Sequence, residues 1–250
     1  MNKKRLLTVM GGSKKSFTPD TLSGLALWFS ADSNLYTDAA KTTAATNDDD
    51  LIYTWGNKVT GGNDFVQATE GARPLLKTVL GLPFLRFDGT DDVMKVDITA
   101  DTTQTLFVVV KKLSAASTYK AFFGYGTYSN IYAKSTDGAP ADQWRYVNNE
   151  AGGVVNLGGT VTNLSVISIV YNGTTAAKIS IDGGTPTEFD PKETTPSFAT
   201  INSLAIGARA ANSAFIDCDI AEVIRYNEVL SDSDRAKVES YLEDKWTNPT

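Results

Sequence analysis

The sequence predicts an all-β fold of two packed antiparallel sheets, with one helix lying outside them at the C-terminal end. Three observations support this prediction. Runs rich in β-branched and aromatic residues recur along the chain, separated by Gly, Pro, Asn and Asp. Asn-Gly and Asp-Gly stretches have the composition of hairpin turns. A single segment near the C-terminus has the apolar spacing of a helix. Many strands with one helix are typical of a sandwich.

Seven runs are predicted to be strands, namely 25–31, 83–87, 105–112, 165–172, 177–182, 203–209 and 214–226. The stretches YNGTT (171–175) and IDGGTP (181–186) are predicted to be turns, because Asn-Gly and Asp-Gly tolerate a positive φ. The run 177–182 alternates, with Ile179 and Ile181 on one face and polar side chains on the other. This alternation is typical of a half-buried strand in an antiparallel sheet.

The predicted helix covers residues 230–246. Ser231 is its expected N-cap, and Asp234 follows three residues later, as in a capping box. The residues at helical spacing that form its apolar stripe are Val238, Tyr241, Leu242 and Trp246. We expect this stripe to pack on the sandwich.

The composition argues against several classes of enzyme and cofactor. The 250 residues include no histidine and one cysteine, Cys218. The absence of histidine excludes Ser-His-Asp and Cys-His catalysis and the usual zinc and iron ligands. One cysteine cannot form an internal disulfide, and Cys218 lies in an apolar strand pattern that favours a buried position. No apolar run is long enough to cross a membrane, so we expect no membrane insertion.

The charge is distributed unevenly along the chain. Residues 1–19 carry five basic residues and no acid, whereas the remainder carries 18 basic and 29 acidic residues, a net charge of −11. We therefore expect a basic N-terminal arm (1–20) and a single domain (21–250), and no nucleic-acid surface on that domain. The start, MNKKRLLTVMGG, has the basic region of a signal peptide, but its apolar stretch is short. We expect no cleaved leader.

We expect the arm to bind a partner protein. The stretch LLTV (6–9) can add a short strand to a neighbour's exposed sheet edge, and the flanking cations can pair with acidic groups there. The residues predicted to make this contact are Lys3, Lys4, Arg5, Leu6, Leu7, Val9, Lys14 and Lys15.

Four segments, in order, carry a resemblance to a known group. They are LSGLALWFSADS (22–33), YTWGNKVTGGNDFVQATEGARPLL (53–76), GLPFLRFDGTDD (81–92) and DIAEVIRYNEVLSDSDRAKVESYLEDKW (219–246). Together they resemble the concanavalin A-like lectin/glucanase superfamily, in its laminin-G-like branch. This resemblance implies a two-sheet jelly roll from about residue 22 onward, and the segment 113–163 contributes little to it.

The strand FIDCDIAEVIRY (215–226) carries three acids, Asp217, Asp219 and Glu222. Glucanases of that superfamily use E-x-D-x-E or E-x-D-x-x-E strands, so the resemblance raises a hydrolase as one alternative. Glu222 lies an odd number of residues from Asp219, and it points the other way unless a bulge intervenes. We therefore expect no catalytic residue here, and acids that cap, pair with Arg225 or face solvent.

Two further features are candidate binding sites. The acidic clusters NDDD (47–50) and DGTDD (88–92) raise calcium as an alternative to our expectation of no cofactor or metal, because some laminin-G relatives carry one. The segment 125–146 is rich in aromatic residues that can offer flat faces to sugar rings, with core packing as the alternative. The predicted ligand-binding residues are Tyr125, Tyr128, Tyr132, Trp144 and Tyr146.

These observations favour a non-enzymatic structural protein of a bacteriophage virion, made in the host cytoplasm and displayed on the particle surface as a capsid decoration, spike or tail-associated protein. The arm would bind other virion proteins, and the lectin-like domain would touch host-surface glycan. We expect many copies, assembled as a homo-oligomer. The alternatives are a free bacterial carbohydrate-binding module or lectin, and a glucanase-like hydrolase.

Overall fold

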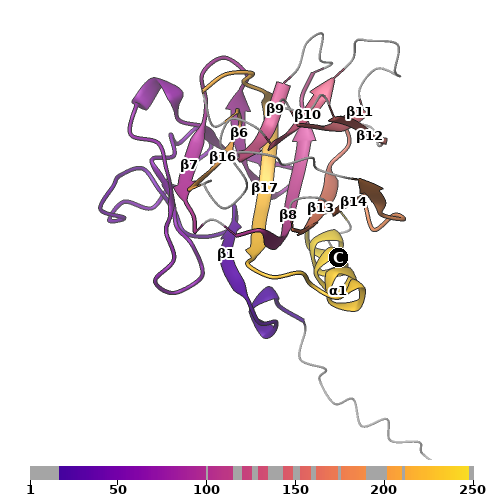
Figure 1. The fold of residues 1–250 in the computed structure, drawn as a ribbon. Helices are drawn as coiled ribbons and strands as arrows, with labels where there is room; N and C mark the ends of the chain where they lie inside the picture. The colour runs from indigo at the N-terminus through magenta and orange to yellow at the C-terminus, as the bar shows by residue number, and fades with distance from the viewer. Residues whose placement is uncertain are drawn as a thin grey trace, which may run out of the picture.

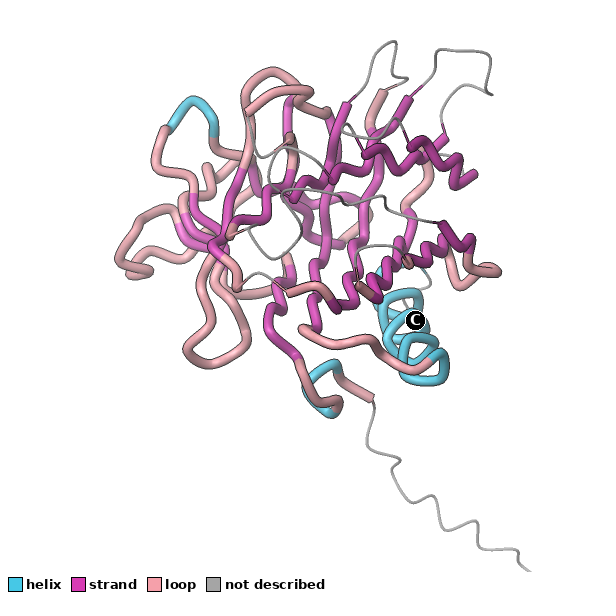
Figure 2. Tube along the Cα trace, viewed as in Figure 1, coloured by secondary structure: helices cyan, strands magenta, loops and turns pink. Residues whose placement is uncertain are grey.

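The computed structural model describes residues 17–99, 101–114, 120–125, 129–134, 143–148, 153–158, 162–173, 176–189, 202–209 and 212–247. The strands of these residues form two antiparallel sheets, and the one α-helix among the described residues lies at the periphery (Figures 1 and 2). The predicted all-β sandwich with a single C-terminal helix is confirmed. The described helices are all too short or too polar to span a bilayer.

The first sheet, sheet A, has eight strands. Seven of them follow the order β15 (Thr187–Phe189), β14 (Ala177–Ile181), β13 (Ser165–Asn172), β8 (Thr103–Lys112), β17 (Asp217–Tyr226), β6 (Leu82–Asp88) and β5 (Leu75–Val79). The eighth, β1 (Leu25–Ser30), pairs with β17. Both β1 and β6 use the same edge of β17: residues 217–220 pair with β6, and residues 222–226 pair with β1.

The second sheet, sheet B, has nine strands. Their order is β12 (Gly153–Gly158), β11 (Gln143–Asn148), β10 (Ser129–Lys134), β9 (Lys120–Tyr125), β16 (Ser203–Ile206), β7 (Met94–Asp97), β4 (Phe65–Val66), β3 (Thr54–Trp55) and β2 (Leu35–Tyr36). All pairs in both sheets are antiparallel.

Aromatic packing joins the two sheets. Phe29 of β1 contacts Phe65 of β4 and Trp55 of β3, with ring centroids 4.5 and 5.6 Å apart. All three side chains are fully buried. Burying one such side chain contributes roughly 1.5–3 kcal/mol, so this cluster alone stabilises the sandwich substantially.

The C-terminal helix α1 (Asp232–Leu242) continues as a π-helical segment, η4 (Glu243–Thr247). Ser231 is its N-cap, as predicted, and its hydroxyl accepts the N–H of Asp234 at 3.1 Å. The buried carboxylate of Glu239 accepts hydrogen bonds from Ser168 of β13 and Ser180 of β14, at 2.6 and 2.9 Å. These bonds fix the helix against sheet A.

The N-terminal side of the body begins before residue 20. The short 3-10 helix η1 (Pro19–Thr21) lies against β17, where the Tyr226 hydroxyl donates to the Pro19 carbonyl at 2.9 Å. Phe17 packs edge-on against Tyr241 of α1. A second 3-10 turn, η2 (Glu70–Ala72), precedes β5.

The carboxylate of Glu222 holds β1, β17 and the C-terminal segment together. Glu222 has no exposed surface. Its two oxygens accept from five side chains at 2.7–3.1 Å: Trp28, Ser30, Tyr241, Lys245 and Trp246. Lys245 also pairs with Asp32, at 2.8 Å. A buried anion is stable only when donors replace the water it has lost, and here they do.

We predict that Glu222→Ala lowers the free energy of unfolding by about 3–5 kcal/mol, because two buried indole N–H groups lose their acceptor and Lys245 loses a partner. Urea denaturation followed by tryptophan fluorescence measures this loss. The control is Glu70→Ala, an exposed acid in η2 that should change stability by no more than about 0.5 kcal/mol. A loss of similar size in both variants would contradict a stabilising role for the Glu222 carboxylate.

Candidate functional site

The three acids of β17 are ion-pair partners rather than a convergent cluster. Asp217 accepts from Lys112 of β8 at 2.5 Å, and Asp219 binds Arg86 of β6 through both oxygens, at 2.7 and 2.8 Å. A bulge between Ile220 and Glu222 brings Glu222 back to the parity of Asp219, and this bulge is the exception that the sequence analysis allowed to the opposite orientation. Each of the three acids nevertheless engages a different cation.

Of the three roles expected for these acids, pairing with Arg225 is not observed among the described residues. The buried Arg225 guanidinium donates to Gln104 of β8 at 2.8 Å and to Asp101 at 2.7 Å. Exposure to solvent, another of the three expected roles, does not hold for Asp219 and Glu222, which are buried.

Four of the five predicted ligand-binding residues, Tyr125, Tyr132, Trp144 and Tyr146, belong to β9, β10 and β11, which are neighbours in sheet B. Trp144 is fully buried, and its ring packs edge-on against Phe122 with centroids 4.8 Å apart. Trp144 therefore belongs to the core and offers no face to a ligand. The side chains of Tyr125, Tyr132 and Tyr146, and all of Tyr128, lie outside the described residues, so their role stays a prediction.

The arm residues predicted to bind a partner also lie outside the described part of the chain. They are Lys3, Lys4, Arg5, Leu6, Leu7, Val9, Lys14 and Lys15.

The two acidic clusters differ in how many of their carboxylate oxygens already have a hydrogen-bond or ion-pair partner. In the first, Asp50 accepts the N–H groups of Thr46 and Asn47, both at 2.9 Å, and Asp48 and Asp49 both pair with Lys77. The hydrogen bonds of Asp50 therefore close a turn, and Asp48 and Asp49 form ion pairs with Lys77.

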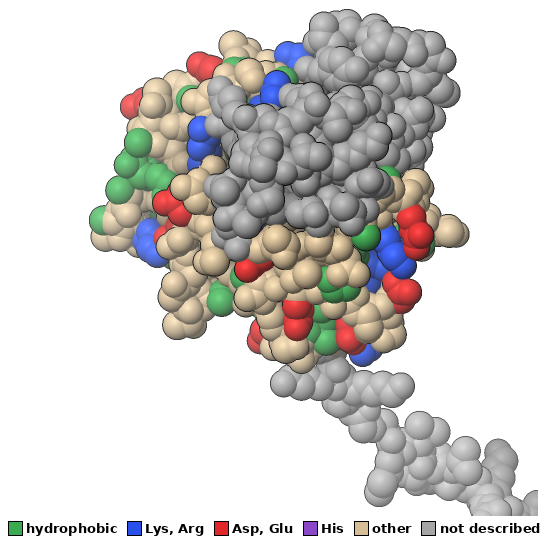
Figure 3. All heavy atoms as spheres, in the orientation of Figure 1, with side chains coloured by type: hydrophobic (Ala, Val, Ile, Leu, Met, Phe, Trp, Pro, Cys, Tyr) green, Lys and Arg blue, Asp and Glu red, His purple; other side chains and the backbone are tan. Residues whose placement is uncertain are grey.

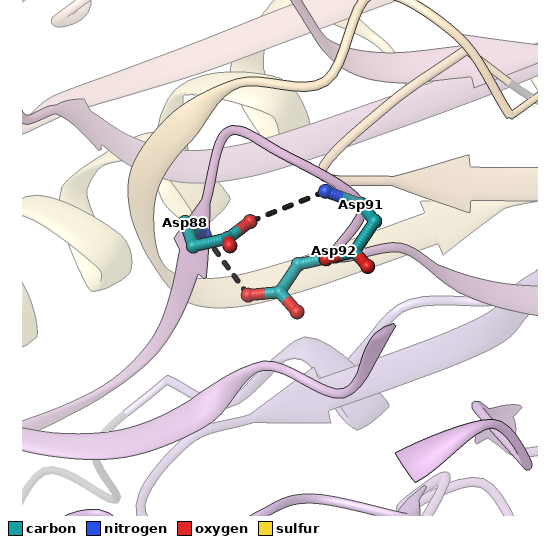
Figure 4. Close-up of side chains that lie close together, drawn as sticks. All are labelled: Asp88, Asp91 and Asp92. Carbon is teal, nitrogen blue, oxygen red and sulfur yellow. Dashed lines mark hydrogen bonds between the residues drawn. The ribbon is translucent and has the colours of Figure 1, made fainter. Parts of the chain in front are cut away.

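The second cluster brings three acids together. Asp88, Asp91 and Asp92 each place one carboxylate oxygen within 4.8 Å of the others (Figure 4). Asp92 accepts the Asp88 N–H at 2.9 Å, and Asp88 accepts those of Thr90 and Asp91 at 2.7 and 3.3 Å. Three oxygens are fewer than the six to eight that calcium takes. The chemistry of the set suits a hard cation, but it does not by itself complete a site.

The pKa values of Asp88 and Asp92 shift in opposite directions. Burial, together with the charges of Asp88 and Asp91, raises the pKa of Asp92 to about 7. Burial also opposes ionisation of Asp88, but backbone N–H groups outweigh it and lower the pKa of Asp88. Such a divergence is also found in acid–base pairs. Neither Asp88 nor Asp92 lines the cleft of about 400 Å³ beside β2, so this pair does not belong to that cleft.

A cleft of about 400 Å³ lies beside β2, and its lining combines polar and apolar residues. Tyr36 lines it with a half-buried ring, and Asp32 and Asn34 line it with exposed side chains. Its other lining residues are Ala31, Ser33, Leu35, Ala44, Ala45, Thr46, Leu76, Thr78 and Pro83.

The local backbone explains how Asn34 reaches this cleft. Asn34 has a φ of 59°, a left-handed conformation that Asn tolerates better than most residues. Its carbonyl accepts the Gly56 N–H at 2.7 Å, which fixes the turn before β2. The neighbouring Asp32 stays ionised: burial alone would raise its pKa, but hydrogen bonds from Lys245 and Ser30 and the charge of Lys245 lower it. The cleft therefore offers an amide and a permanent carboxylate. The sequence analysis missed both residues, and the only indication was a polar segment next to an aromatic residue.

The face of the molecule shown in Figure 3 carries acidic and basic side chains interspersed among the described residues.

No protein-family model matches the chain, and no curated protein matches it either. Solved structures do share its fold. A Trypanosoma rangeli sialidase complex is 13% identical with a TM-score of 0.61, and the match covers 92% of this chain and 34% of the sialidase. The receptor-binding domain of botulinum neurotoxin D is 8% identical with a TM-score of 0.58, covering 87% of this chain and 52% of that one. At these identities the similarity shows the β-sandwich fold alone.

The similarity to sialidases corrects one prediction. We expected a chain that is not an enzyme, and this expectation is contradicted, because the solved structures that share the fold include glycosidases. The chain spans about a third of the length of these sialidases, 34% in each of the complexes compared.

We predict that Asp92→Asn stabilises the protein above pH 7. The pKa of Asp92 is raised in the folded state, so the folded protein holds an extra proton between about pH 4 and 7 and loses this contribution as the pH rises through that window. Asn keeps an acceptor for the Asp88 N–H and never ionises. The expected gain at pH 8 is about 1–2 kcal/mol, allowing for screening by nearby water, and it should shrink toward zero by pH 4.

Urea denaturation at pH 4, 6 and 8 measures this difference, with Asp91→Asn, an exposed member of the same cluster, as the control. Equal stability of Asp92→Asn and wild type at pH 8 would show that the Asp92 carboxylate is not under electrostatic stress.

Proposed function

We propose that this chain is a carbohydrate-binding β-sandwich and that the cleft beside β2 holds the sugar. The fold supports the proposal. Among the solved structures that share it are a Trypanosoma rangeli sialidase in complex with sialic acid, with a TM-score of 0.59, and the toxin receptor-binding domain.

The single observation that carries the proposal is the composition of the cleft. A sugar presents a C–H face and a rim of hydroxyl groups. The ring of Tyr36 suits the C–H face, because aromatic rings bind flat apolar surfaces and tolerate water at their polar end. The Asn34 amide donates and accepts, and the ionised Asp32 accepts, so neighbouring hydroxyl groups find both kinds of partner. A largely preformed cleft with a few convergent polar groups is the usual form of a small-ligand site.

We predict that Asn34→Gly weakens sugar binding about tenfold. Glycine adopts the positive φ of this position without strain, so the variant removes the amide and leaves the turn intact. The loss of one neutral hydrogen-bonding group corresponds to about 1–1.5 kcal/mol, or about tenfold in affinity. A glycan array identifies the ligand, and calorimetry measures both variants with it.

The matched control is Asn212→Gly. Asn212 is also exposed and also has a positive φ, 53°, but it does not line the cleft. Equal loss of sugar binding in both variants, or no loss in Asn34→Gly, would show that the sugar does not bind in this cleft. Mass spectrometry of the bound oligosaccharide distinguishes binding from turnover: shortened products would identify a glycosidase.

For the setting of this domain we propose a bacteriophage particle, on which residues 1–16 attach the domain and the sandwich displays the cleft toward host-surface glycan. The charge distribution supports this proposal, since a segment with five cations and no acid precedes a body with a net charge of −11. The alternative is a free bacterial lectin with the same cleft, and the location of the chain distinguishes the two.

We predict that deleting residues 1–16 leaves a folded domain that binds sugar with unchanged affinity but no longer joins the particle. The deletion stops before Phe17 because its ring packs against Tyr241, and Pro19 accepts a hydrogen bond from Tyr226. Mass spectrometry of purified particles measures incorporation of each form. Equal incorporation of the truncated and full-length chains would contradict the attachment role, and absence of both from particles would favour the free lectin.

A further inference from the structure

The hairpin between β5 and β6 ends in an unusual turn. Leu80 and Gly81 are its two central residues, and their φ angles are 53° and 83°. Two positive φ values identify a type I′ turn, in which the first position favours Asn, Asp or Gly. A leucine there opposes the left-handed conformation through its Cβ. The Leu80 side chain is also 99% exposed.

Leu80 therefore strains the backbone and buries nothing within its own chain. Its neighbours Val79, Leu82 and Pro83 are each partly exposed, so the hairpin tip is apolar as a whole. The outer edge of β5 is covered, because Leu76 exchanges backbone hydrogen bonds of 2.9 Å with Asp49 and Asp50. The tip, and not the strand edge, is thus the part of this hairpin available to a partner. Exposure of one leucine alone is ordinary. Backbone strain at the same residue is what makes the tip a candidate contact, because strained residues cluster at functional sites.

A groove of mixed polar and apolar lining lies at the opposite edge of the same sheet, with Asn172, Lys178, Glu188, Ser231 and Asp232 as its polar residues. It has a volume of about 610 Å³ and is bounded by β13, β14, β15 and the segment leading into α1. The apolar residues among its described lining are Val170, Ala176, Ala177, Phe189, Val229 and Leu230. Val229 is 40% exposed, so part of this lining remains open to solvent.

The strand order sets the geometry of a contact between these two surfaces. β5 and β15 are the two ends of the seven-strand order in sheet A. We propose that Leu80 of one copy of this chain inserts into the β13–β15 groove of the next copy. The two surfaces differ, so the contact is head-to-tail, and repetition builds a ring if the rotation closes and a filament if it does not.

Sedimentation velocity over a range of protein concentrations tests this contact. Wild-type protein should grow in mass with concentration, and Leu80→Asn should stay monomeric under the same conditions. Asn suits the type I′ turn, so the melting temperature of this variant in its monomeric form should rise by about 2–4 °C. Loss of association together with a gain in stability separates a docking residue from a folding defect. Leu113→Asn, at another partly exposed leucine, is the control that should associate like wild type.

A second variant, Val229→Asp, places a charge in the groove and should also be monomeric. The variant Leu80→Asn keeps an intact groove, and Val229→Asp keeps Leu80. A mixture of the two should therefore form a species of two chains that grows no further. Wild-type protein that stays monomeric at every concentration, Leu80→Asn that associates like wild type, or a mixture that forms no pair would each overturn the proposal.

Discussion

The burial of one carboxylate constrains much of this structure. Residue 221 of β17 marks the point where one neighbour, β6, gives way to another, β1, and a bulge there turns Glu222 toward the C-terminal segment. A fully buried anion requires donors, and Glu222 finds them in β1 and in the segment 241–246. The electrostatic requirement of one side chain thus ties together parts of the chain that are almost 200 residues apart in sequence, since Trp28 and Glu222 are separated by 194 positions.

The same requirement decides where function can reside. Asp217 and Asp219 hold Lys112 and Arg86, and Glu222 holds Lys245, so the most acidic strand has little free capacity for a substrate. Chemical groups with spare hydrogen-bonding capacity lie instead on connections, as at Asn34 before β2. This division is common: rigid strands position loops, and loops carry ligand contacts.

Sequence reasoning predicted the elements with a strong apolar pattern and missed others of similar length: β9, β10, β11 and β12 have six residues each, as β1 does, and none of them was predicted. β1, β6, β8, β13, β14, β17 and α1 were predicted close to their observed bounds, because each carries enough apolar residues for a pattern to be visible. β2, β3 and β4 have two residues each, and only their partners in sheet B define them. The orientation of Glu222 stayed conditional on a bulge, because a bulge depends on tertiary pairing and leaves no residue pattern.

The candidate sites were harder to predict than the fold for a related reason. Trp144 and a sugar-binding tryptophan look alike in sequence, and only its packing on Phe122 places it in the core. Asn34, by contrast, is one of many polar residues until the fold places it in the lining of a cleft. Leu80 resembles a strand residue in sequence, and it becomes exceptional only once both φ angles of the turn are known.

The two proposed surfaces share one hairpin. Thr78 and Pro83 line the cleft beside β2, and they flank the turn that carries Leu80. Docking through Leu80 would therefore repeat the cleft at a fixed spacing along an assembly. A cleft with few polar groups binds a single sugar weakly, but repeated clefts on one assembly convert later binding events into intramolecular ones, and avidity can then exceed single-site affinity by about 10²–10⁴. The strained backbone conformation at Leu80 would thus give the assembly a higher avidity for a surface covered in repeated glycans, with no additional contact to any one sugar.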